Sequence, residues 1–241
     1  MYLSRVNVLA EQPDELMGIL TANHYELHQL LWRLFPERNA QEPRDFLFRR
    51  DEHKGFPVFY LQSPTPPTAI PGLLSVETKP YNPQLKIGDR LRFTLRANPV
   101  AQTRLARSAD EQTALAAARL ARGLREKNLL PQKRVRHDVV MQLKTSLSAA
   151  EKEHYSEAEL VQQAGMAWLA RKAENVGFKL LEASAEGYQQ HHFKKRGIKI
   201  STIDFNGVLE VTDPQLFIQA LYSGIGPAKA FGCGLLSVAR A

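Results

Sequence analysis

Residues 198–222 read IKISTIDFNGVLEVTDPQLFIQALY, in which a long strand pattern leads directly into a helix pattern. Ile198–Val211 is rich in β-branched and aromatic residues, as a strand requires. Asp213–Tyr222 opens with Asp-Pro, which favours a helix start because aspartate caps the first turn and proline fits its first position. We therefore expect a strand and a helix in immediate succession.

The segments on either side extend this order. Glu157–Glu174 has the apolar spacing of an amphipathic helix, and Gly177–Leu181 follows it as a strand. Arg90–Arg96 alternates basic and apolar residues, which indicates a half-buried strand. Leu235–Ala239 closes the chain as a further strand. The second half therefore reads βαββαβ, the order of a ferredoxin-like domain.

The first half shows the same order less clearly. We expect a short helix or loop at 13–21, a helix at 23–35, and strands at 1–8, 44–50, 56–62 and 73–78. The proline-rich residues 63–68 leave room only for a degenerate second helix. We predict an α+β fold of two tandem ferredoxin-like (RRM-like, βαββαβ) domains at 1–89 and 90–241. The second domain is expected to hold a helical and basic insertion at about 100–150, including a helix at 109–127.

The composition excludes some classes of protein. Lys and Arg number 32 against 25 Asp and Glu, and the net charge of +7 permits phosphate binding without requiring it. No stretch is apolar for long enough to cross a bilayer, and Met1–Val8 lacks the features of a signal peptide, so we expect a cytoplasmic protein. The single cysteine, Cys233, excludes an internal disulfide and is expected to be structural.

The expected helix at 23–35 carries candidate catalytic residues. Tyr25 and His28 lie three residues apart and so share one side of the helix, with His24 close to His28. Cleavage of RNA by its own 2′-hydroxyl needs a base, an acid and cations beside the phosphorus. Imidazole can transfer protons in either direction near neutral pH, whereas the phenol of tyrosine is suited to orienting or donating.

Two other interpretations of His28 stay open. The side chain can simply pack beside Leu27 and Leu31 on the apolar side of the helix. His24 and His28 can also bind zinc as a pair, but the sequence offers no third ligand and no His-Glu-x-x-His motif, so we expect no metal site.

Basic residues form two clusters that carry no amphipathic helix pattern. The first comprises Lys133, Arg134 and Arg136, and the second comprises Lys194, Lys195 and Arg196 beside His191 and His192. Such clusters can bind RNA phosphates, or they can be solvated loops.

A glycine-rich segment precedes the last expected strand. It runs from Gly224 to Gly234 as GIGPAKAFGCG, and it contains Gly226, Gly232 and the cation Lys229. Glycines let a backbone approach phosphate closely, although a tight turn has the same requirement. The segment lacks the ending of a Walker loop and follows a helix rather than a strand, so we expect no nucleotide cofactor, and no other cofactor is indicated.

These motifs together resemble the CasE family of CRISPR-associated endoribonucleases, the RNA-processing subunits of type I-E Cascade, over nearly the whole chain. The resemblance rests on residues 1–4 (MYLS), 25–29 (YELHQ), 31–36 (LWRLFP), 44–48 (RDFLF), 95–99 (LRANP), 224–229 (GIGPAK) and 232–237 (GCGLLS).

The resemblance implies a function and roles for named residues. His28 is implied to be the catalytic histidine and Tyr25 its partner, cutting the 3′ base of a repeat hairpin without metal and leaving a cyclic phosphate and a 5′-hydroxyl. The two basic clusters are implied to grip the RNA stem, and the glycine-rich segment is implied to help hold the RNA. Retention of the product and assembly with other Cascade subunits are expected as well.

Two rival functions stay open on the sequence alone. A non-catalytic scaffold would hold the repeat hairpin with the same basic residues and leave it uncut, with His28 structural. A small-molecule-binding ferredoxin-like protein would ignore repeat RNA, although the basic clusters are unusual for such a protein.

Overall fold

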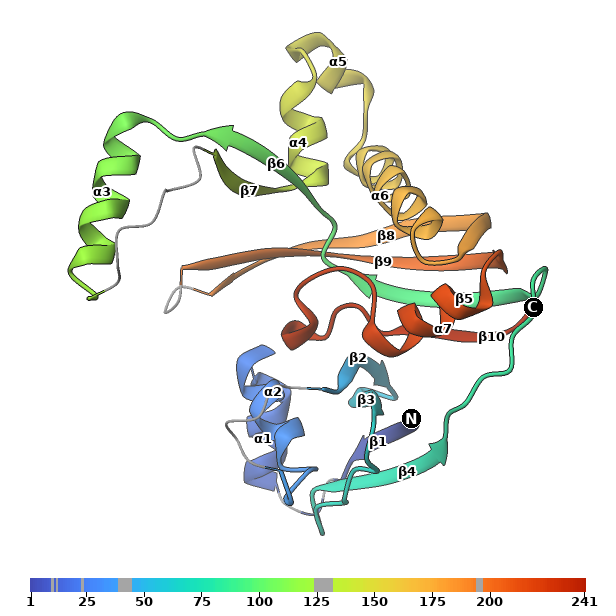
Figure 1. Cartoon of the computed structure of the whole chain (residues 1–241). Helices are drawn as coiled ribbons and strands as arrows, with labels where there is room; N and C mark the ends of the chain where they lie inside the picture. Colours follow the sequence, from blue (N-terminus) through green and yellow to red (C-terminus); the bar gives the residue numbers. More distant parts are fainter. Residues whose placement is uncertain (10, 12, 23, 39–44, 124–131, 194–196) are drawn as a thin grey trace.

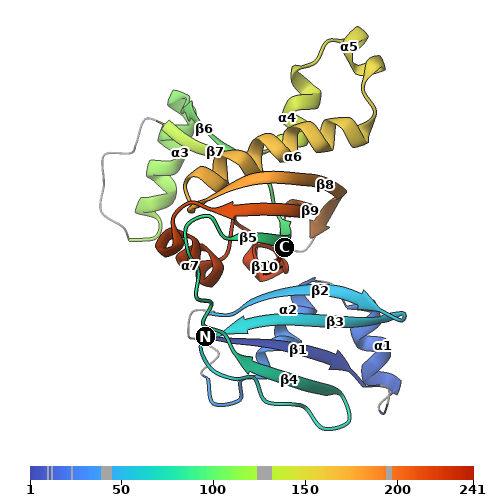
Figure 2. The same cartoon turned by 90° about the vertical axis from the view of Figure 1, so that its right-hand side faces the viewer.

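The computed structural model (Figure 1) describes residues 1–241 except 10, 12, 23, 39–44, 124–131 and 194–196. It contains two four-stranded antiparallel sheets, each with its own hydrophobic core. The sheets lie one above the other when seen from the side (Figure 2). Among the described residues, no helix is both long enough and apolar enough to cross a membrane.

The N-terminal sheet has the strand order β2-β3-β1-β4. Its elements are β1 (Tyr2–Val8), α1 (Pro13–Thr21), α2 (His24–Trp32), β2 (Leu47–His53), β3 (Phe56–Ser63) and β4 (Leu74–Pro80). Counted along the chain, the strands lie in the order 4-1-3-2, the arrangement that a split βαβ unit produces. The ferredoxin-like topology predicted for this half is therefore confirmed.

Two local predictions in this half were inexact. The strands expected at 44–50 and 56–62 leave residues 51–55 as their connection, but β2 and β3 continue until only Lys54 and Gly55 connect them, with φ values of 52° and 78°. Two central residues with positive φ form the type of turn that matches strand twist. Residues 64–73 form turns and an isolated bridge between Ile70 and Leu74 rather than even a degenerate helix, because their prolines remove helix donors.

The C-terminal sheet has the strand order β10-β5-β9-β8, again 4-1-3-2 when counted within this half. Its elements are β5 (Arg90–Ala97), α6 (Glu157–Glu174), β8 (Phe178–Phe193), β9 (Ile198–Val211), α7 (Pro214–Ser223) and β10 (Leu236–Arg240). The strand β8 is much longer than the five residues expected, and it contains His191 and His192, the histidines beside the second basic cluster. Register shifts at Leu180/Glu182 and Glu186/Gln189 interrupt the alternation by which a strand is recognised.

The insertion is an arm that projects from the C-terminal sheet (Figure 1). We define the arm as β6 (Val100–Ala106), α3 (Ala109–Leu120) and β7 (Gln132–Asp138); α4 (Val139–Ser146) and α5 (Ala149–His154) lead from it to α6. The helix α3 buries no residue and is held at its start by a capping box between Ser108 and Glu111. The cluster Lys133–Arg136 lies in the strand β7, so the alternative that it is a loop was wrong.

Polar contacts join the two halves. Arg96 of β5 binds Asp204 through two hydrogen bonds of 2.7 and 2.8 Å and also donates to the backbone oxygen of Arg50 in β2. Arg49 of β2 donates to Thr94 of β5 at 2.6 Å. We call these contacts the joint. Because guanidinium groups with several fixed acceptors are strongly oriented, the joint sets how β2 and the preceding α2 lie against the C-terminal sheet.

Candidate functional site

His28 lies on α2, which Leu27 and Leu31 anchor in the N-terminal core. Its half-buried imidazole stacks on the buried ring of Phe46, with centroids 6.1 Å apart, and meets the edge of Trp32 at 6.3 Å. Aromatic contacts on two sides restrict the rotamers of the ring. The side chain is therefore held in place by packing, and part of it stays accessible.

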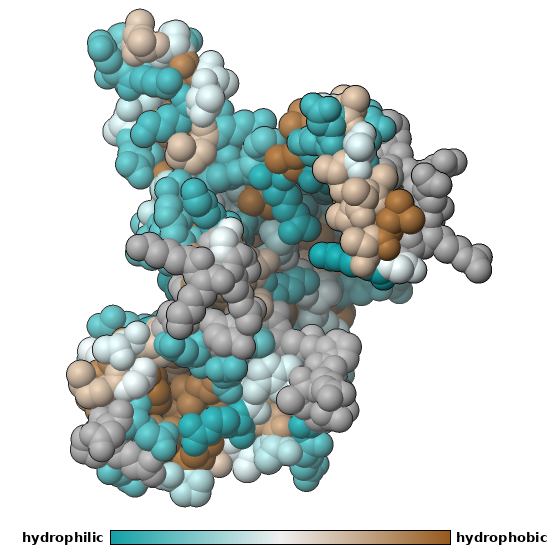
Figure 3. Space-filling model, turned by 90° about the vertical axis from the view of Figure 1, so that its left-hand side faces the viewer, coloured by the Kyte–Doolittle hydropathy of each residue, from teal (hydrophilic) through white to brown (hydrophobic). Residues whose placement is uncertain are grey.

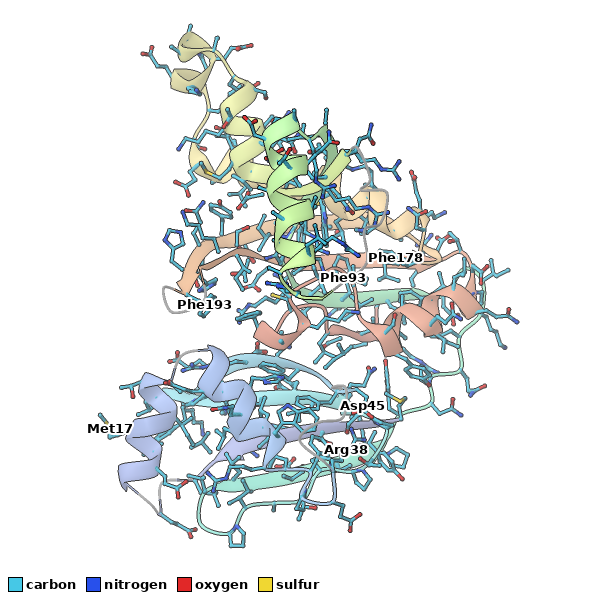
Figure 4. All side chains as sticks on the ribbon, turned by 60° about the vertical axis from the view of Figure 1, so that its left-hand side comes forward. Met17, Arg38, Asp45, Phe93, Phe178 and Phe193 are labelled. Atoms are coloured by element: carbon cyan, nitrogen blue, oxygen red, sulfur yellow. The ribbon has the colours of Figure 1, made fainter. Side chains whose placement is uncertain are left out.

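A cavity of about 500 Å³ opens beside this imidazole, and His28, Arg33 and Arg38 are among the residues that line it. Arg38 forms an ion pair with Asp45, as Figure 4 shows, and also bonds Thr65 at 3.0 Å. Arg33 is half exposed and reaches Glu15 at 3.4 Å. Sequence reasoning missed both arginines, because neither is three or four residues from His28.

Tyr25 belongs to α2 and precedes His28 by three residues, which places both on one side of the helix. The side chain of Tyr25 lies outside the described part of the structure, and so does that of His24. The contact expected between Tyr25 and His28 therefore stays a prediction.

The glycine-rich segment packs against α2. Lys229–Phe231 forms a short 3-10 helix that contacts both α2 and β2. The amine of Lys229 donates to the backbone oxygen of Ser223. The structure thus brings the C-terminal glycine-rich segment next to the helix that carries His28, although almost 200 residues separate them in sequence.

Packing explains why glycine occupies these positions. The four glycines have φ values between 77° and 93°, a region that side chains rarely adopt. A β-carbon at Gly224 would lie 2.8 Å from Leu47, and one at Gly232 would lie 3.2 Å from the ring of Phe48. The segment therefore fits closely over β2 of the other half. Contact of Gly224, Gly226, Gly232 and Gly234 with RNA stays a prediction.

The β8–β9 hairpin reaches the same place. The ring of Phe193 at the end of β8 lies 4.9 Å from the ring of Phe231 in the 3-10 helix. Figure 4 shows Phe193 at the hairpin tip, above the helices of the N-terminal half. The expected RNA-binding residues Lys194, Lys195 and Arg196 lie outside the described residues, within the connection between these two strands.

The first basic cluster is divided between the two sides of β7. Lys133 forms an ion pair with Glu111 of α3. Arg134 and Arg136 are exposed on the alternate side. Arg136 lines a cleft of about 630 Å³ together with His192, Lys199 and Phe231. Figure 3, which views the face toward which the arm and the hairpin point, shows many hydrophilic side chains over this region.

The candidate site thus comprises α2, the glycine-rich segment, the β8–β9 hairpin and the arm, each in contact with the next or lining a cleft with it. Within the described ranges, no three His, Cys, Asp or Glu side chains are grouped as they would be to hold a metal ion. The buried thiol of Cys233 has a pKa raised to about 12 by burial, so it is protonated at neutral pH and unsuited to nucleophilic attack.

Comparison with known proteins agrees with this arrangement. The model of a family described as CRISPR associated protein matches residues 1–240. The CRISPR system Cascade subunit CasE of Escherichia coli K12 is 32% identical over 245 aligned positions, covering 99% of each chain. The CRISPR-associated endoribonuclease Cse3 of Thermus thermophilus is 33% identical over 239 positions, covering 90% of each.

A solved structure of Thermus thermophilus Cse3, bound to an RNA representing a pre-cleavage complex, superimposes with a TM-score of 0.65 and 28% identity. The superposition covers 99% of this chain and 98% of that one. Sequence and fold therefore agree along essentially the entire length, and the chain belongs to this family of CRISPR-associated proteins.

Proposed function

We propose that this protein is a metal-independent endoribonuclease that cuts CRISPR precursor RNA at the 3′ base of the repeat stem-loop. It then stays bound to the mature crRNA as a Cascade subunit. Two observations carry this proposal. The glycine-rich segment contacts both α2, which holds His28, and the β8–β9 hairpin. The chain also aligns along 90% of its length with a relative named an endoribonuclease.

The chemistry needs only RNA and side chains. The 2′-hydroxyl oxygen attacks the adjacent phosphorus, and the bond from phosphorus to the 5′-oxygen breaks. One proton leaves the 2′-oxygen and one reaches the 5′-oxygen, so the products are a cyclic phosphate and a 5′-hydroxyl. His28 transfers a proton as acid or base, and Tyr25 orients it or shares the proton. Cations beside the cavity, such as Arg33, offset the charge that develops on phosphate.

RNA binding is assigned to the basic surfaces around this site. Two groups of residues are proposed to grip the stem: Lys133, Arg134 and Arg136 of the arm, and Lys194, Lys195 and Arg196, which follow β8 in the sequence. An A-form stem is recognised largely through its shape, phosphates and 2′-hydroxyls, which suits lysine and arginine. Lys229 and the four glycines are proposed to hold the strand next to α2. The proposal places the protein in the cytoplasm, where its RNA is made, and requires no cofactor.

The test is a cleavage reaction with the host repeat RNA in excess EDTA. We expect one new 5′-hydroxyl end and a cyclic phosphate on the other fragment. An RNA with a 2′-deoxy sugar at the cut position should stay intact, because it lacks the nucleophile. Retention of uncut repeat RNA by the protein would instead indicate a scaffold, and cleavage only after Mg²⁺ is restored would contradict metal independence.

A further inference from the structure

The cleft between the arm and the β8–β9 hairpin has a polar floor that the proposed cleavage chemistry does not use. Asn98, in the connection between β5 and β6, and Ser201 of β9 both line it, and each is only 3% exposed. The Oδ1 atom of Asn98 and the Oγ atom of Ser201 have no hydrogen-bond partner among the described residues. Two such atoms in one cleft are unusual, because burying an unsatisfied polar group costs free energy.

The remainder of the cleft differs from this floor. Its edge carries the exposed cations Arg136 and Lys199, contributed by β7 and β9, and the exposed side chain of His192 from β8. Its wall includes the half-buried ring of Phe231, from the 3-10 helix that contacts α2. The volume of about 630 Å³ is that of a small-molecule site. The cleft therefore combines uncharged hydrogen-bonding groups inside, an aromatic wall and positive charge at the edge. One carboxylate, Asp138, also lines it, but its oxygens already accept hydrogen bonds from the backbone of Val140 and Met141 and from the hydroxyl of Tyr188.

This combination selects one kind of ligand. A carbonyl oxygen at the floor repels an anion and requires an N–H or O–H donor, whereas the cations at the edge attract phosphate. A nucleotide satisfies both, with its base inside and its phosphate outside. The bases of a stem are already paired, so the nucleotide must be unpaired, as in most sequence-specific RNA recognition. An aromatic side chain at the wall also suits a base.

We propose that this cleft is a specificity subsite for one unpaired nucleotide of the repeat RNA, with Asn98 and Ser201 binding its base. The inference rests on the proposed function and deepens it, since it adds a position at which RNA sequence is read. The cleft adjoins the 3-10 helix that packs on α2, so a nucleotide held there aligns the strand that passes the catalytic helix.

The test measures binding of the full-length protein to repeat RNAs that carry a 2′-deoxy sugar at the cut position, so that nothing is cleaved. A series of these RNAs has one abasic nucleotide at each unpaired position beside the stem. For wild type, we expect one abasic position to weaken binding roughly threefold to tenfold, the effect of one or two hydrogen bonds. Ser201→Ala and Asn98→Leu should each weaken binding of the intact RNA, and each should lose less affinity than wild type does when the base at that same position is removed, because one contact to the base is already missing.

Stability separates this role from a structural one. Because the hydroxyl of Ser201 bonds no described group, Ser201→Ala should leave the free energy of unfolding unchanged or higher while affinity falls. Ser4 is a matched control: it is also a buried serine, but it bonds Thr78 at 2.9 Å on the other sheet. Ser4→Ala should lower stability and leave affinity unchanged.

The inference is overturned if the variants discriminate against the abasic series as wild type does, or if no abasic position weakens binding. Should Asn98→Leu not fold, Ser201→Ala alone decides between these outcomes. Failure of the proposed function itself would be recognised separately, since wild type would then leave the ordinary repeat RNA uncut.

Discussion

Cys233 lies at the centre of the glycine-rich segment, fully buried between Gly232 and Gly234. Burial raises the pKa of its thiol to about 12, so the thiol stays protonated at pH 8. Because the thiolate is the reactive form, iodoacetamide should leave the native protein unmodified and should label the urea-unfolded protein fully.

The same burial sets the effect of replacing Cys233. Cys233→Ala should lower the free energy of unfolding by about 1 kcal/mol, through a small cavity, and should leave RNA cleavage intact. Rapid alkylation of the native protein, measured by mass spectrometry, would contradict the description of this residue as structural.

At the scale of elements, the β8–β9 hairpin contains a titratable group whose pKa is shifted. Burial, and secondly the charge of Arg96, hold the pKa of His191 below its ordinary value of 6.5. The unfolded chain therefore binds a proton at a higher pH than the folded protein does, and stability falls as pH drops below about 6.5. The loss of stability should level off once the pH is below the pKa that His191 has in the folded protein.

Replacing His191 by glutamine tests this dependence. Glutamine can still bond Thr202, which the imidazole meets at 3.1 Å, but it does not titrate. Urea unfolding between pH 8 and pH 5 should show a smaller loss of stability in His191→Gln than in wild type. Equal losses would show that the hairpin does not suppress protonation of this side chain.

Elements were predictable where one side of the chain is apolar. The helix α6 and the strand β9 have the bounds expected from sequence, because their buried residues recur at helix or strand spacing in one continuous core. The strands β6 and β7 were missed, because they pair only with each other in a two-stranded ribbon, and only Ala101 of their residues is an apolar side chain packed against a core. Without an apolar side, their sequence resembles a solvated loop.

At the scale of the molecule, the joint is one of the contacts that hold the two halves together, beside the packing of the glycine-rich segment on α2 and β2. Arg96→Lys would lose the paired hydrogen bonds to Asp204 and the bond to the backbone of Arg50. We expect the free energy of unfolding to fall by about 1–2 kcal/mol, with slower RNA cleavage because α2 is held less precisely against the 3-10 helix.

Arg90 offers a matched control on the same strand. Its side chain is 68% exposed, and its ion pair with Glu210 is long, at 3.6 Å. Arg90→Lys should therefore change the free energy of unfolding by less than about 0.5 kcal/mol. Equal effects of the two substitutions in urea titrations would show that the joint contributes nothing particular to stability.

The candidate site was predictable only in part, because it forms where the two halves of the molecule pack together. His28 and Lys229 stand out by residue type, but their proximity depends on how two domains pack, which no local pattern encodes. Arg33 and Arg38 were missed because they reach the cavity from the end of α2 and the turn after it. The partnership of Tyr25 with His28 stays a prediction from helix geometry.

The most direct test of the account is the single-turnover rate of repeat RNA cleavage in EDTA by His28→Ala. A positioned proton-transfer group contributes about 10² to 10⁴ in rate, so we predict a fall of that size with little change in RNA affinity. His53→Ala, the same substitution at an exposed histidine of the β2–β3 hairpin, should cleave like wild type. Cleavage by His28→Ala at the wild-type rate would remove His28 from the mechanism and contradict the account.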